Sequence, residues 1–502
     1  MKVRTFSKSK LLAYRQCPKR LWLEIHRPEL RADSSATQAS FKVGHKVGEI
    51  AQKLYDPMGK GQLINAQEEG FAAAFARSSD LLASSQPIFE AGFKAAGALA
   101  FADVMLPKRK AGQRTWRMVE VKSSTSVKDY HRDDTAIQAF VARAAGVPLS
   151  SIVLAYIDSK WIYPGGGDYE GLLVEEDLTK EAFAREPEVK AWIAEAQLIA
   201  AKSKEPKLGT GGHCSDPYEC GFLGYCQGQE VQAQYPVQWL PRIQSKALKS
   251  HIEDGAVIDM VDVPDELLNE RQQRVKAHTL ADNVFFDEKN AAAELAAHKL
   301  PAYFLDFETI QFAVPIWKGT RPYQQIPFQF SLHRLSRMGK LEKKSFLDLS
   351  GDDPSKSFTD ALISACGDRG PVFVYNAGFE TARIRELADR FPKFKKSLLA
   401  INERVVDLLP IAQQHYYHPS QQGSWSIKKV LPAVAPELSY GDLEGVQDGG
   451  MAMETFLEAI AVETSQTRKS QIEQQLLAYC SLDTYAMVKL WQFFSGRSEL
   501  KV

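Results

Sequence analysis

The sequence predicts an α/β protein made of three successive segments, and three observations support this. Residues 299–502 alternate strand-like apolar runs, such as "AYFLDFETI" and "PVFVYNAG", with stretches of helical pattern, which is typical of α/β folds. Residues 1–230 contain the strand-like runs "GALAFADVML", "TWRMVEVKSS" and "SIVLAYID" among helical segments. Residues 231–298 are polar and helix-prone, so we expect a helical connector between two α/β domains.

The composition is ordinary for a globular protein. The chain has 502 residues, of which 44% are hydrophobic and 25% charged, which is sufficient for two or three domains. No apolar run of about 18 residues is present, and the start "MKVRTFSKSK" lacks the apolar core of a signal peptide. We therefore expect a cytoplasmic protein without a membrane partner. Because the net charge is zero, nucleic acid would bind to local basic grooves or through bound metals.

Two carboxylates, Asp306 and Glu308, interrupt the apolar run "YFLDFETI". Side chains two residues apart in a strand share one face, so these acids would lie side by side. A like-charged pair is costly in a buried strand unless a cation balances it, and hard divalent ions prefer carboxylate oxygens. The alternative is an edge strand whose polar face meets solvent. Residues elsewhere in the chain must decide between a metal site and a solvated strand.

The third segment contains further candidates for the same site. The run "GPVFVYNAGFETARIRELADRF" predicts a buried strand, a turn and a helix that begins near Glu380. The run "EQQLLAYCSLDTYAMVKLWQFF" predicts one long helix, in which Tyr479 and Asp483 share a face because they are four residues apart. Four acids from one strand and two helices suit a two-metal site that cleaves phosphodiester bonds.

Three features between these motifs have alternative interpretations. Asp407 follows "RVV" at a predicted strand end, where a structural hydrogen-bonding role competes with a catalytic one. The segment "GSWSIKKVLP" contains Trp425, Lys428 and Lys429, which suit stacking on bases and contacts to phosphates. The run "QQHYYHPS" is either a stacking surface or the packed end of a helix, and packing is favoured.

A second set of polar residues lies in the first segment. Asp103 is in "LAFADVMLP", and Glu120 and Lys122 share a face of the predicted strand "RMVEVKSST". Asp103 and Glu120 can hold one or two Mg²⁺ ions, while Lys122 can orient water or stabilise charge on a phosphate. Gln138, in the amphipathic run "YHRDDTAIQAFVARAAG", is placed to contact a substrate. An ordinary surface ion pair is the alternative for Glu120 and Lys122, and the added Asp103 and Gln138 favour a site.

Three of the six cysteines are evenly spaced in the turn-rich run "HCSDPYECGFLGYCQ": Cys214, Cys220 and Cys226. A disulfide framework is not expected in a long cytosolic chain, and turns of this kind wrap ligands around a metal centre. Cys17 is the candidate for a fourth thiolate, and four thiolates hold either tetrahedral zinc or an iron–sulfur cluster. Unconnected structural cysteines are the alternative. Cys366 and Cys480 lie in apolar helical runs, where a buried cysteine is the default.

The motifs of the first segment resemble those of RecB-type PD-(D/E)XK nucleases. "ADVMLP", "VEVKSS" and "DDTAIQAF" are similar to motifs II and III and to the glutamine helix of that family. With Cys17 before them and three cysteines after them, they resemble the iron–sulfur subgroup, which includes AddB and the CRISPR-associated exonucleases of similar layout. The resemblance covers residues 1–230. It implies a restriction-endonuclease-like fold whose ends are joined by a [4Fe-4S] cluster, with zinc as the alternative.

The motifs of the third segment resemble those of DEDD exonucleases, which have the RNase H-like fold. Asp306 and Glu308 match the DxE motif, and Tyr479 and Asp483 match the YxxxD motif of the tyrosine-containing subclass. The resemblance covers residues 299–495. It implies that the acids hold two metal ions for hydrolysis from the 3′ end, and that the tyrosine helps to position the attacking water.

Each resemblance has one departure from its family's pattern. The run "FKVGHKVGEIAQKLY" has Gly48 where the PD-(D/E)XK relatives usually have a metal-binding histidine, for which His45, Glu49 or Glu90 could substitute. In "NAGFE", Glu380 stands where the second DEDD motif usually ends in aspartate, and the additional methylene lengthens the ligand arm. We expect the two metal sites to differ from those of their families at these positions.

Together the motifs resemble bacterial predicted RecB-family nucleases, whose C-terminal half is a domain of unknown function. We expect a metal-dependent nuclease with two active centres that uses Mg²⁺ or Mn²⁺ at DNA ends or in single strands. One alternative has only the DEDD domain active, as a 3′–5′ exonuclease on RNA, with the first domain as a binding module. The other is a non-enzymatic scaffold that binds nucleic-acid ends. The helicase phosphate loop GxxxxGK[ST] is absent, so unwinding would need a helicase partner, and a defence-system partner is also compatible.

Overall fold

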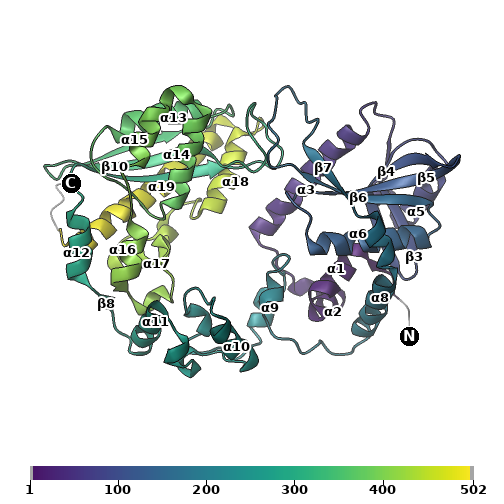
Figure 1. The fold of residues 1–502 in the computed structure, drawn as a ribbon, viewed down its shortest axis with the longest axis horizontal. Helices are drawn as coiled ribbons and strands as arrows, with labels where there is room; N and C mark the ends of the chain where they lie inside the picture. The colour runs from purple at the N-terminus through teal and green to yellow at the C-terminus, as the bar shows by residue number, and fades with distance from the viewer. Residues whose placement is uncertain (1–3, 498–502) are drawn as a thin grey trace. The chain divides into compact units, whose positions relative to one another are not determined.

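The computed structural model describes residues 4–497, apart from the side chain of Lys110, and the chain divides into two compact units (Figure 1). Unit 1 comprises Met1–Glu230 and Phe312–Gln324, and unit 2 comprises Val231–Gln311 and Gln325–Val502. Both units combine mixed sheets with helices, so the predicted α/β class is confirmed. Within the described residues, every helix is too short or too polar to cross a lipid bilayer.

Unit 1 is built on a seven-stranded mixed sheet, in which six strands follow the order β2–β3–β4–β5–β6–β7 and the seventh, β1, pairs with β4. The strands are β1 Phe6–Ser7, β2 Gln62–Leu63, β3 Ile88–Ala95, β4 Ala98–Lys110, β5 Gln113–Lys122, β6 Leu149–Ile157 and β7 Leu173–Asp177. Strands β3, β4 and β5 form an antiparallel meander, and β5 then pairs in parallel with β6. Helix α6 (Asp129–Ala144) makes the crossover that this parallel pair requires.

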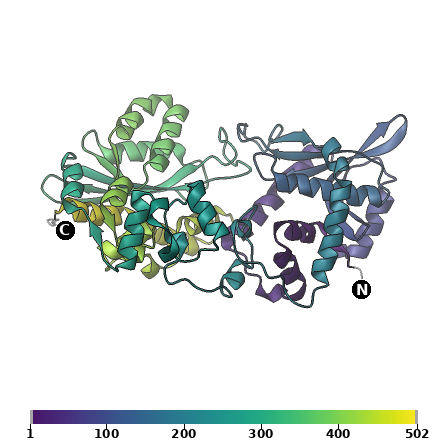
Figure 2. The same cartoon turned by 60° about the horizontal axis from the view of Figure 1, so that its bottom comes forward.

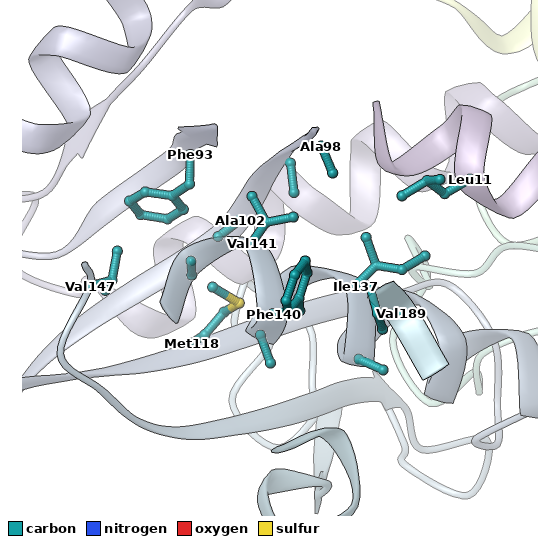
Figure 3. Close-up of a cluster of buried hydrophobic side chains, with 14 of the residues drawn as sticks. Leu11, Phe93, Ala98, Ala102, Met118, Ile137, Phe140, Val141, Val147 and Val189 are labelled. Atoms are coloured by element: carbon teal, nitrogen blue, oxygen red, sulfur yellow. The ribbon is translucent and has the colours of Figure 1, made fainter. Parts of the chain in front are cut away.

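Helices of unit 1 pack against both faces of this sheet. Figure 3 shows Ile137, Phe140 and Val141 of α6 beside Ala102 and Met118 of the strands, in the larger of its cores. A smaller core lies on the opposite face and includes a side chain of α3. The other helices are α1 Lys8–Gln16, α2 Pro18–His26, α3 Ser35–Tyr55, α4 Ala66–Glu69, α5 Phe71–Leu81, α7 Thr179–Ala184, α8 Glu186–Ala200 and α9 Leu223–Gln227.

Alternation along β5 turns its two polar residues toward α6. Met118 belongs to the core beneath α6, whereas Val119 belongs to the core on the opposite face. Because side chains two residues apart in a strand share a face, Glu120 and Lys122 lie on the same face of β5 as Met118. The predicted strand and its shared polar face are therefore confirmed.

Unit 2 is built on a five-stranded mixed sheet of order β11–β10–β9–β12–β13. The strands are β9 Ala302–Ile310, β10 Ile326–Leu335, β11 Leu341–Leu347, β12 Val372–Val374 and β13 Val405–Asp407. Strand β9 is central, since it pairs antiparallel with β10 and parallel with β12. A separate two-stranded sheet pairs β8 (Phe285–Phe286) with β14 (Tyr416–Tyr417).

Two layers of helices cover the sheet of unit 2. The long helix α19 (Gln466–Ser495) packs on β9 and β10, and α13 (Ser355–Cys366) packs on β10 from the other side (Figure 2). The remaining helices are α10 Lys246–Asp254, α11 Glu270–Leu280, α12 Glu288–Ala296, α14 Gly378–Arg390, α15 Lys395–Asn402, α16 Leu408–His415, α17 Ile427–Val434 and α18 Gly449–Ile460. The segment predicted as a helical connector, residues 231–298, contains α10, α11 and α12 and is part of unit 2.

Alternation along β9 directs its acids toward α19. Phe304 belongs to the core beneath α19, whereas Leu305 and Phe307 belong to the core beneath α13. Asp306 and Glu308 lie on the same face of β9 as Phe304, because each is two residues from the one before. This face is turned toward α19, the helix that contains the YxxxD motif. The predicted strand, the predicted long helix and the shared face of the two acids are thus confirmed.

Candidate active sites

Strand β9 and helix α19 bring two acids and a thiol together in unit 2. Asp306, Glu308 and Cys480 each offer a ligand atom within 4.8 Å of the other two, and no other trio of His, Cys, Asp or Glu in residues 4–497 does so. The Sγ atom of Cys480 lies 3.8 Å from Asp306 Oδ2. Glu308 is only 8% exposed and β9 is paired on both sides, so the solvated edge strand is wrong.

The predicted partners of these acids also lie around them. Burial, and then the charges of Asp483, Glu308 and Glu380, raise the pKa of Asp306 well above its usual value. Burial is likewise the main cause that raises the pKa of Glu308 to about 8, that of Glu380 to about 8 and that of Asp483 to about 6. Each of these carboxylates would therefore be stabilised by a bound cation.

Glu380 is a buried carboxylate with one oxygen that lacks a hydrogen-bond partner among the described residues. The side chain begins in the first turn of α14, as predicted, and the residue is 2% exposed. Its Oε2 atom has no hydrogen-bond partner within the described part of the chain. A buried carboxylate oxygen without a partner is costly, so a ligand that contacts this atom would be stabilising.

Two tyrosines and a lysine lie over the carboxylates. Tyr440 donates a hydrogen bond from its hydroxyl to Asp483 Oδ1, at 2.6 Å. The ammonium of Lys428 is 5.1 Å from the centre of the Tyr440 ring and 5.3 Å from that of Tyr479. Burial, and then Asp483, raise the pKa of the Tyr479 hydroxyl far above its usual value, so this phenol stays neutral. No sequence pattern indicated Tyr440, which lies in a short 3₁₀ turn outside the motifs.

Asp407 has the structural hydrogen-bonding role that was one of the two interpretations of its position. Its carboxylate accepts hydrogen bonds from the backbone N–H groups of Asn376, Ala377 and Leu409, each at 2.9 Å. Asn376 has a φ of +76°, so the turn before α14 needs such support. By fixing this turn, Asp407 fixes the start of the helix that carries Glu380.

The expected stacking role of Trp425 is wrong. Trp425 is 4% exposed, and its indole N–H donates to the backbone oxygen of Tyr416 at 2.7 Å, so the ring belongs to the core. His415, Tyr416 and Tyr417 are also buried, which confirms the packing interpretation of "QQHYYHPS". Nearby, the ammonium of Lys429 donates to the side-chain oxygen of Gln422.

The predicted acids of unit 1 line one cavity of about 670 Å³. Strands β3, β4 and β5 contribute Glu90, Asp103, Glu120 and Lys122 to its wall. Helices α1 and α3 contribute Lys8, Gly44, His45, Gly48, Glu49 and Gln52. A cavity lined by several acids, of which Glu120 is fully buried, and by two lysines is a candidate functional site on geometry alone.

Lys8 and Lys122 hold Glu120 and Asp134 in a closed ring of ion pairs. Lys8 Nζ is 2.8 Å from Glu120 Oε1 and 3.1 Å from Asp134 Oδ1. Lys122 Nζ is 2.6 Å from Glu120 Oε1 and 2.7 Å from Asp134 Oδ2. Gln138 donates from Nε2 to the other oxygen of Glu120, so all three predicted groups, Glu120, Lys122 and Gln138, meet here.

The ring separates the pKa values of its two acids. Burial, and then Asp103 and Asp134, raise the pKa of Glu120 to about 8. Burial opposes ionisation of Asp134 as well, but Lys122 and Lys8 hold its pKa well below the usual value. Sequence reasoning missed Lys8 and Asp134, because Lys8 lies in a basic helix far from the motifs and Asp134 lies in a run of polar residues.

Asp103 reaches the cavity because side-chain alternation breaks in β4. Ala102 belongs to the core beneath α6, but Val104, two residues later, belongs to the opposite core. Across from Asp103 on β3, Glu90 has a φ of +55°, which a residue other than glycine rarely adopts. Asp103 Oδ2 accepts a hydrogen bond from the Val121 N–H at 2.7 Å, which ties β4 to β5 beside the acids.

Gly48 leaves space in the wall of this cavity. A Cβ atom at Gly48 would meet nothing within 4 Å. Of the three predicted substitutes for a histidine there, His45 and Glu49 are exposed, and Glu49 pairs with Lys46 at 3.2 Å. Glu90 lies on β3 beside the strand of Asp103, and burial and then the charge of Glu120 raise its pKa.

The four predicted cysteines line one small pocket, together with His213. Cys17 lies between α1 and α2, Cys214 ends a 3₁₀ turn, Cys220 follows it in a loop and Cys226 lies in α9. Burial raises the pKa of the Cys17, Cys220 and Cys226 thiols. Segments from both ends of unit 1 thus meet at this pocket, as the sequence hypothesis requires.

Comparisons with known proteins give partial similarities. Residues 303–426 match the Domain of unknown function (DUF2779). Over 209 residues, 38% of this chain, the sequence is 30% identical to the "Uncharacterized protein MG366 homolog" of Mycoplasma pneumoniae (strain ATCC 29342 / M129 / Subtype 1), and this match covers 31% of that protein. The sequence is also 27% identical, over 215 residues or 39% of this chain, to the "Uncharacterized protein MG366" of Mycoplasma genitalium (strain ATCC 33530 / DSM 19775 / NCTC 10195 / G37). This second match covers 32% of the Mycoplasma genitalium protein. The matched part of the chain therefore spans about a third of the length of these curated relatives. The domain match includes Asp306, Glu308 and Glu380 and ends before α19.

Proposed function

We propose that this protein is a metal-dependent nuclease with two active centres that hydrolyses phosphodiester bonds at DNA ends or in single strands. The proposal rests above all on the buried convergence of acids beside β9, where Glu380 Oε2 has no partner among the described residues. A bound divalent cation would supply charge stabilisation and an activated water at a scissile phosphate. The side chains that would hold it are Asp306, Glu308, Glu380 and Asp483.

Other side chains of unit 2 would position the substrate. The Tyr479 hydroxyl, one turn of α19 before Asp483, would orient the attacking water, as in the DEDD subclass that the YxxxD spacing resembles. Lys428 brings a positive charge over the rings of Tyr440 and Tyr479, where a phosphate of the strand would be attracted. Two features of the sheet support an RNase H-like fold. The acids lie on its central strand, β9, and the strands β11, β10 and β9 pair antiparallel, whereas β12 and β13 continue the sheet in parallel with β9.

Unit 1 would provide the second centre, of PD-(D/E)XK type. The support is the common cavity of Asp103, Glu120 and Lys122, and the hydrogen bond from Gln138 of the crossover helix to Glu120. The ammonium of Lys122 would stabilise negative charge that develops on the phosphate. Asp103 and Glu120 would hold Mg²⁺ or Mn²⁺.

The four cysteines, which line one small pocket, would hold a [4Fe-4S] cluster with a structural role, as in the iron–sulfur subgroup that their placement resembles. Tetrahedral zinc is the alternative for the same four thiolates. Anaerobically purified protein should be brown and absorb broadly near ~400 nm, whereas colourless protein that contains zinc would reject the cluster.

A second function is favoured by the ring of lysines in unit 1. Both oxygens of Glu120 are engaged by Lys8, Lys122 and Gln138, which leaves this acid less free to hold a metal. In this alternative, unit 1 binds nucleic acid and only the centre of unit 2 cleaves, with RNA as a possible substrate class. It predicts that Lys122→Ala weakens binding and leaves the products of cleavage unchanged.

The test uses Asp306→Ala and Lys122→Ala separately, on 3′-labelled single-stranded DNA, double-stranded DNA and RNA, with Mg²⁺ or Mn²⁺. We expect each substitution to remove a different series of products. Loss of all products in Asp306→Ala alone, with none lost in Lys122→Ala, would support the second function. Unchanged cleavage in both variants and in the double variant would refute both.

A further inference from the structure

Cys480 differs from the other cysteine that lies buried in a helix of unit 2. Cys366 and Cys480 are both 0% exposed. Cys366 packs in the core of α13 and α15, and the charged groups that affect its pKa are Arg404 and Lys344. Cys480 instead directs its Sγ at Asp306, with Oδ2 and the backbone oxygen both at 3.8 Å. The thiol thus lies beside a carboxylate, where it can either donate a weak S–H hydrogen bond or share a metal ion.

The spacing of the three side chains is that of ligands to one ion. With metal–sulfur and metal–oxygen bonds of about 2.3 and 2.1 Å, sulfur and oxygen in a tetrahedral site are about 3.6 Å apart. The distance of 3.8 Å from Cys480 Sγ to Asp306 Oδ2 is close to that value. The ligand atom of Glu308 lies within 4.8 Å of both. Only small side-chain adjustments would bring all three to one ion.

A second observation concerns another carboxylate of the same proposed site. Glu380 keeps a buried oxygen with no hydrogen-bond partner among the described residues. A hydrogen bond from the thiol to Asp306 satisfies one carboxylate only and leaves Glu380 unsatisfied. A cation beside Asp306, Glu308 and Cys480 would compensate the whole group.

We infer that Cys480 is a thiolate ligand to the divalent cation of unit 2 and that this ion is Zn²⁺ or Co²⁺ rather than Mg²⁺. The inference rests on the proposed function, because it names the ion of the same centre. Thiolate ligands select borderline and soft ions, whereas Mg²⁺ prefers oxygen ligands and keeps several waters. The sequence treats Cys480 as an ordinary buried cysteine, and only the pairing of α19 with β9 brings the thiol to the acids.

The test is a titration of the full-length protein with Co²⁺, after removal of divalent ions and without oxygen. A Co²⁺ ion bound by a thiolate has a sulfur-to-metal charge-transfer band in the near ultraviolet, which oxygen ligands do not give. We expect this band in wild-type difference spectra and in Cys366→Ser, and its loss in Cys480→Ser. The affinity for Co²⁺ should fall at least about tenfold in Cys480→Ser, while that for Mg²⁺ changes little.

Cys366→Ser is the matched control, since it removes an equally buried thiol, and any band from the cysteines of unit 1 is common to all three proteins. Cys480→Ala serves as a second variant, because it adds no hydroxyl and keeps a small helix-forming side chain. An equal band in the wild type and in both Cys480 variants, or no band in the wild type, would overturn the inference. If Asp306→Ala removes its own series of products while the Cys480 variants keep the band, the ligand inference fails and the proposed function stands. If the wild type cleaves nothing, the proposed function fails.

Discussion

Lys8 of helix α1 and Lys122 of strand β5 contact the same oxygen of Glu120. Lys8 Nζ is 2.8 Å and Lys122 Nζ 2.6 Å from Glu120 Oε1. Both lysines also pair with Asp134, so two cations already neutralise the two acids. Metal binding at Glu120 must compete with at least one ammonium group. Lys8 is therefore the residue that decides how easily this centre takes up a metal.

Replacing Lys8 by methionine should increase the Mn²⁺ affinity of unit 1, because the removed ammonium no longer repels the ion. Without metal the same change should destabilise the fold by about 1–3 kcal/mol, since Glu120 and Asp134 lose a partner. The measurements are Mn²⁺ titration and denaturant unfolding, both in an Asp306→Ala background that disables the other centre. Lys10→Met is the control, as Lys10 is on the same helix and has no ion pair within the described residues. Equal Mn²⁺ affinity in the two variants would contradict this prediction.

Gly48→His should add a metal ligand to the cavity of unit 1. A Cβ there meets no atom within 4 Å, so the side chain has space. We expect tighter Mn²⁺ binding by about tenfold and faster cleavage in the Asp306→Ala background. Gly48→Ala is the control: it should stabilise α3 by up to about 1 kcal/mol through helix propensity and leave the Mn²⁺ affinity unchanged. Tighter binding in both variants would show that helix stability, rather than the imidazole, is the cause.

Patterns of short range were sufficient to predict much of both sites. Alternation in β9 and the four-residue spacing in α19 placed Asp306, Glu308, Tyr479 and Asp483 correctly, because both periods are local properties of the backbone. The same holds for the strand of Glu120 and Lys122.

What the sequence did not predict depends on tertiary contacts. Lys8 joins Glu120 only because α1 packs against α6, and Tyr440 reaches Asp483 from an irregular turn. Trp425 was expected to stack on bases, yet its ring is buried in the core. Sequence periodicity carries no information on contacts of this kind.

The stability of unit 2 without metal should fall as the pH rises from about 5 to about 8. Folding raises the pKa of Glu308 and Glu380 from their usual values to about 8, so the folded state binds more protons than the unfolded state over this range. The stabilisation is complete below the unfolded pKa and is lost as pH passes through the folded one. Thermal unfolding with a chelator present measures this, and Mn²⁺ should restore stability at pH 8.

Glu308→Gln provides the control for that experiment, because the amide does not titrate. The decrease between pH 5 and pH 8 should be smaller in this variant than in the wild type. An identical decrease in the two proteins would assign the effect to other groups, such as Glu120.

Tyr440→Phe should shift the acidic limb of the activity profile to higher pH. The Tyr440 hydroxyl donates to Asp483, and this hydrogen bond lowers the pKa of that acid. Without it Asp483 protonates more readily, so activity at pH 6 should fall several-fold relative to activity at pH 8. Initial rates across this range, with Tyr416→Phe as the control, measure the shift. A uniform loss of rate at every pH would instead indicate a purely structural role for Tyr440.

The most direct test of the two-centre account is the residual cleavage of the double variant Asp306→Ala/Lys122→Ala in Mn²⁺. Initial rates on 3′-labelled single-stranded DNA are compared with those of the wild type, of each single variant and of the wild type with a chelator. The account predicts that each single variant keeps part of the activity and that the double variant falls to the level of the chelated wild type. Metal-dependent cleavage by the double variant above that level would contradict it.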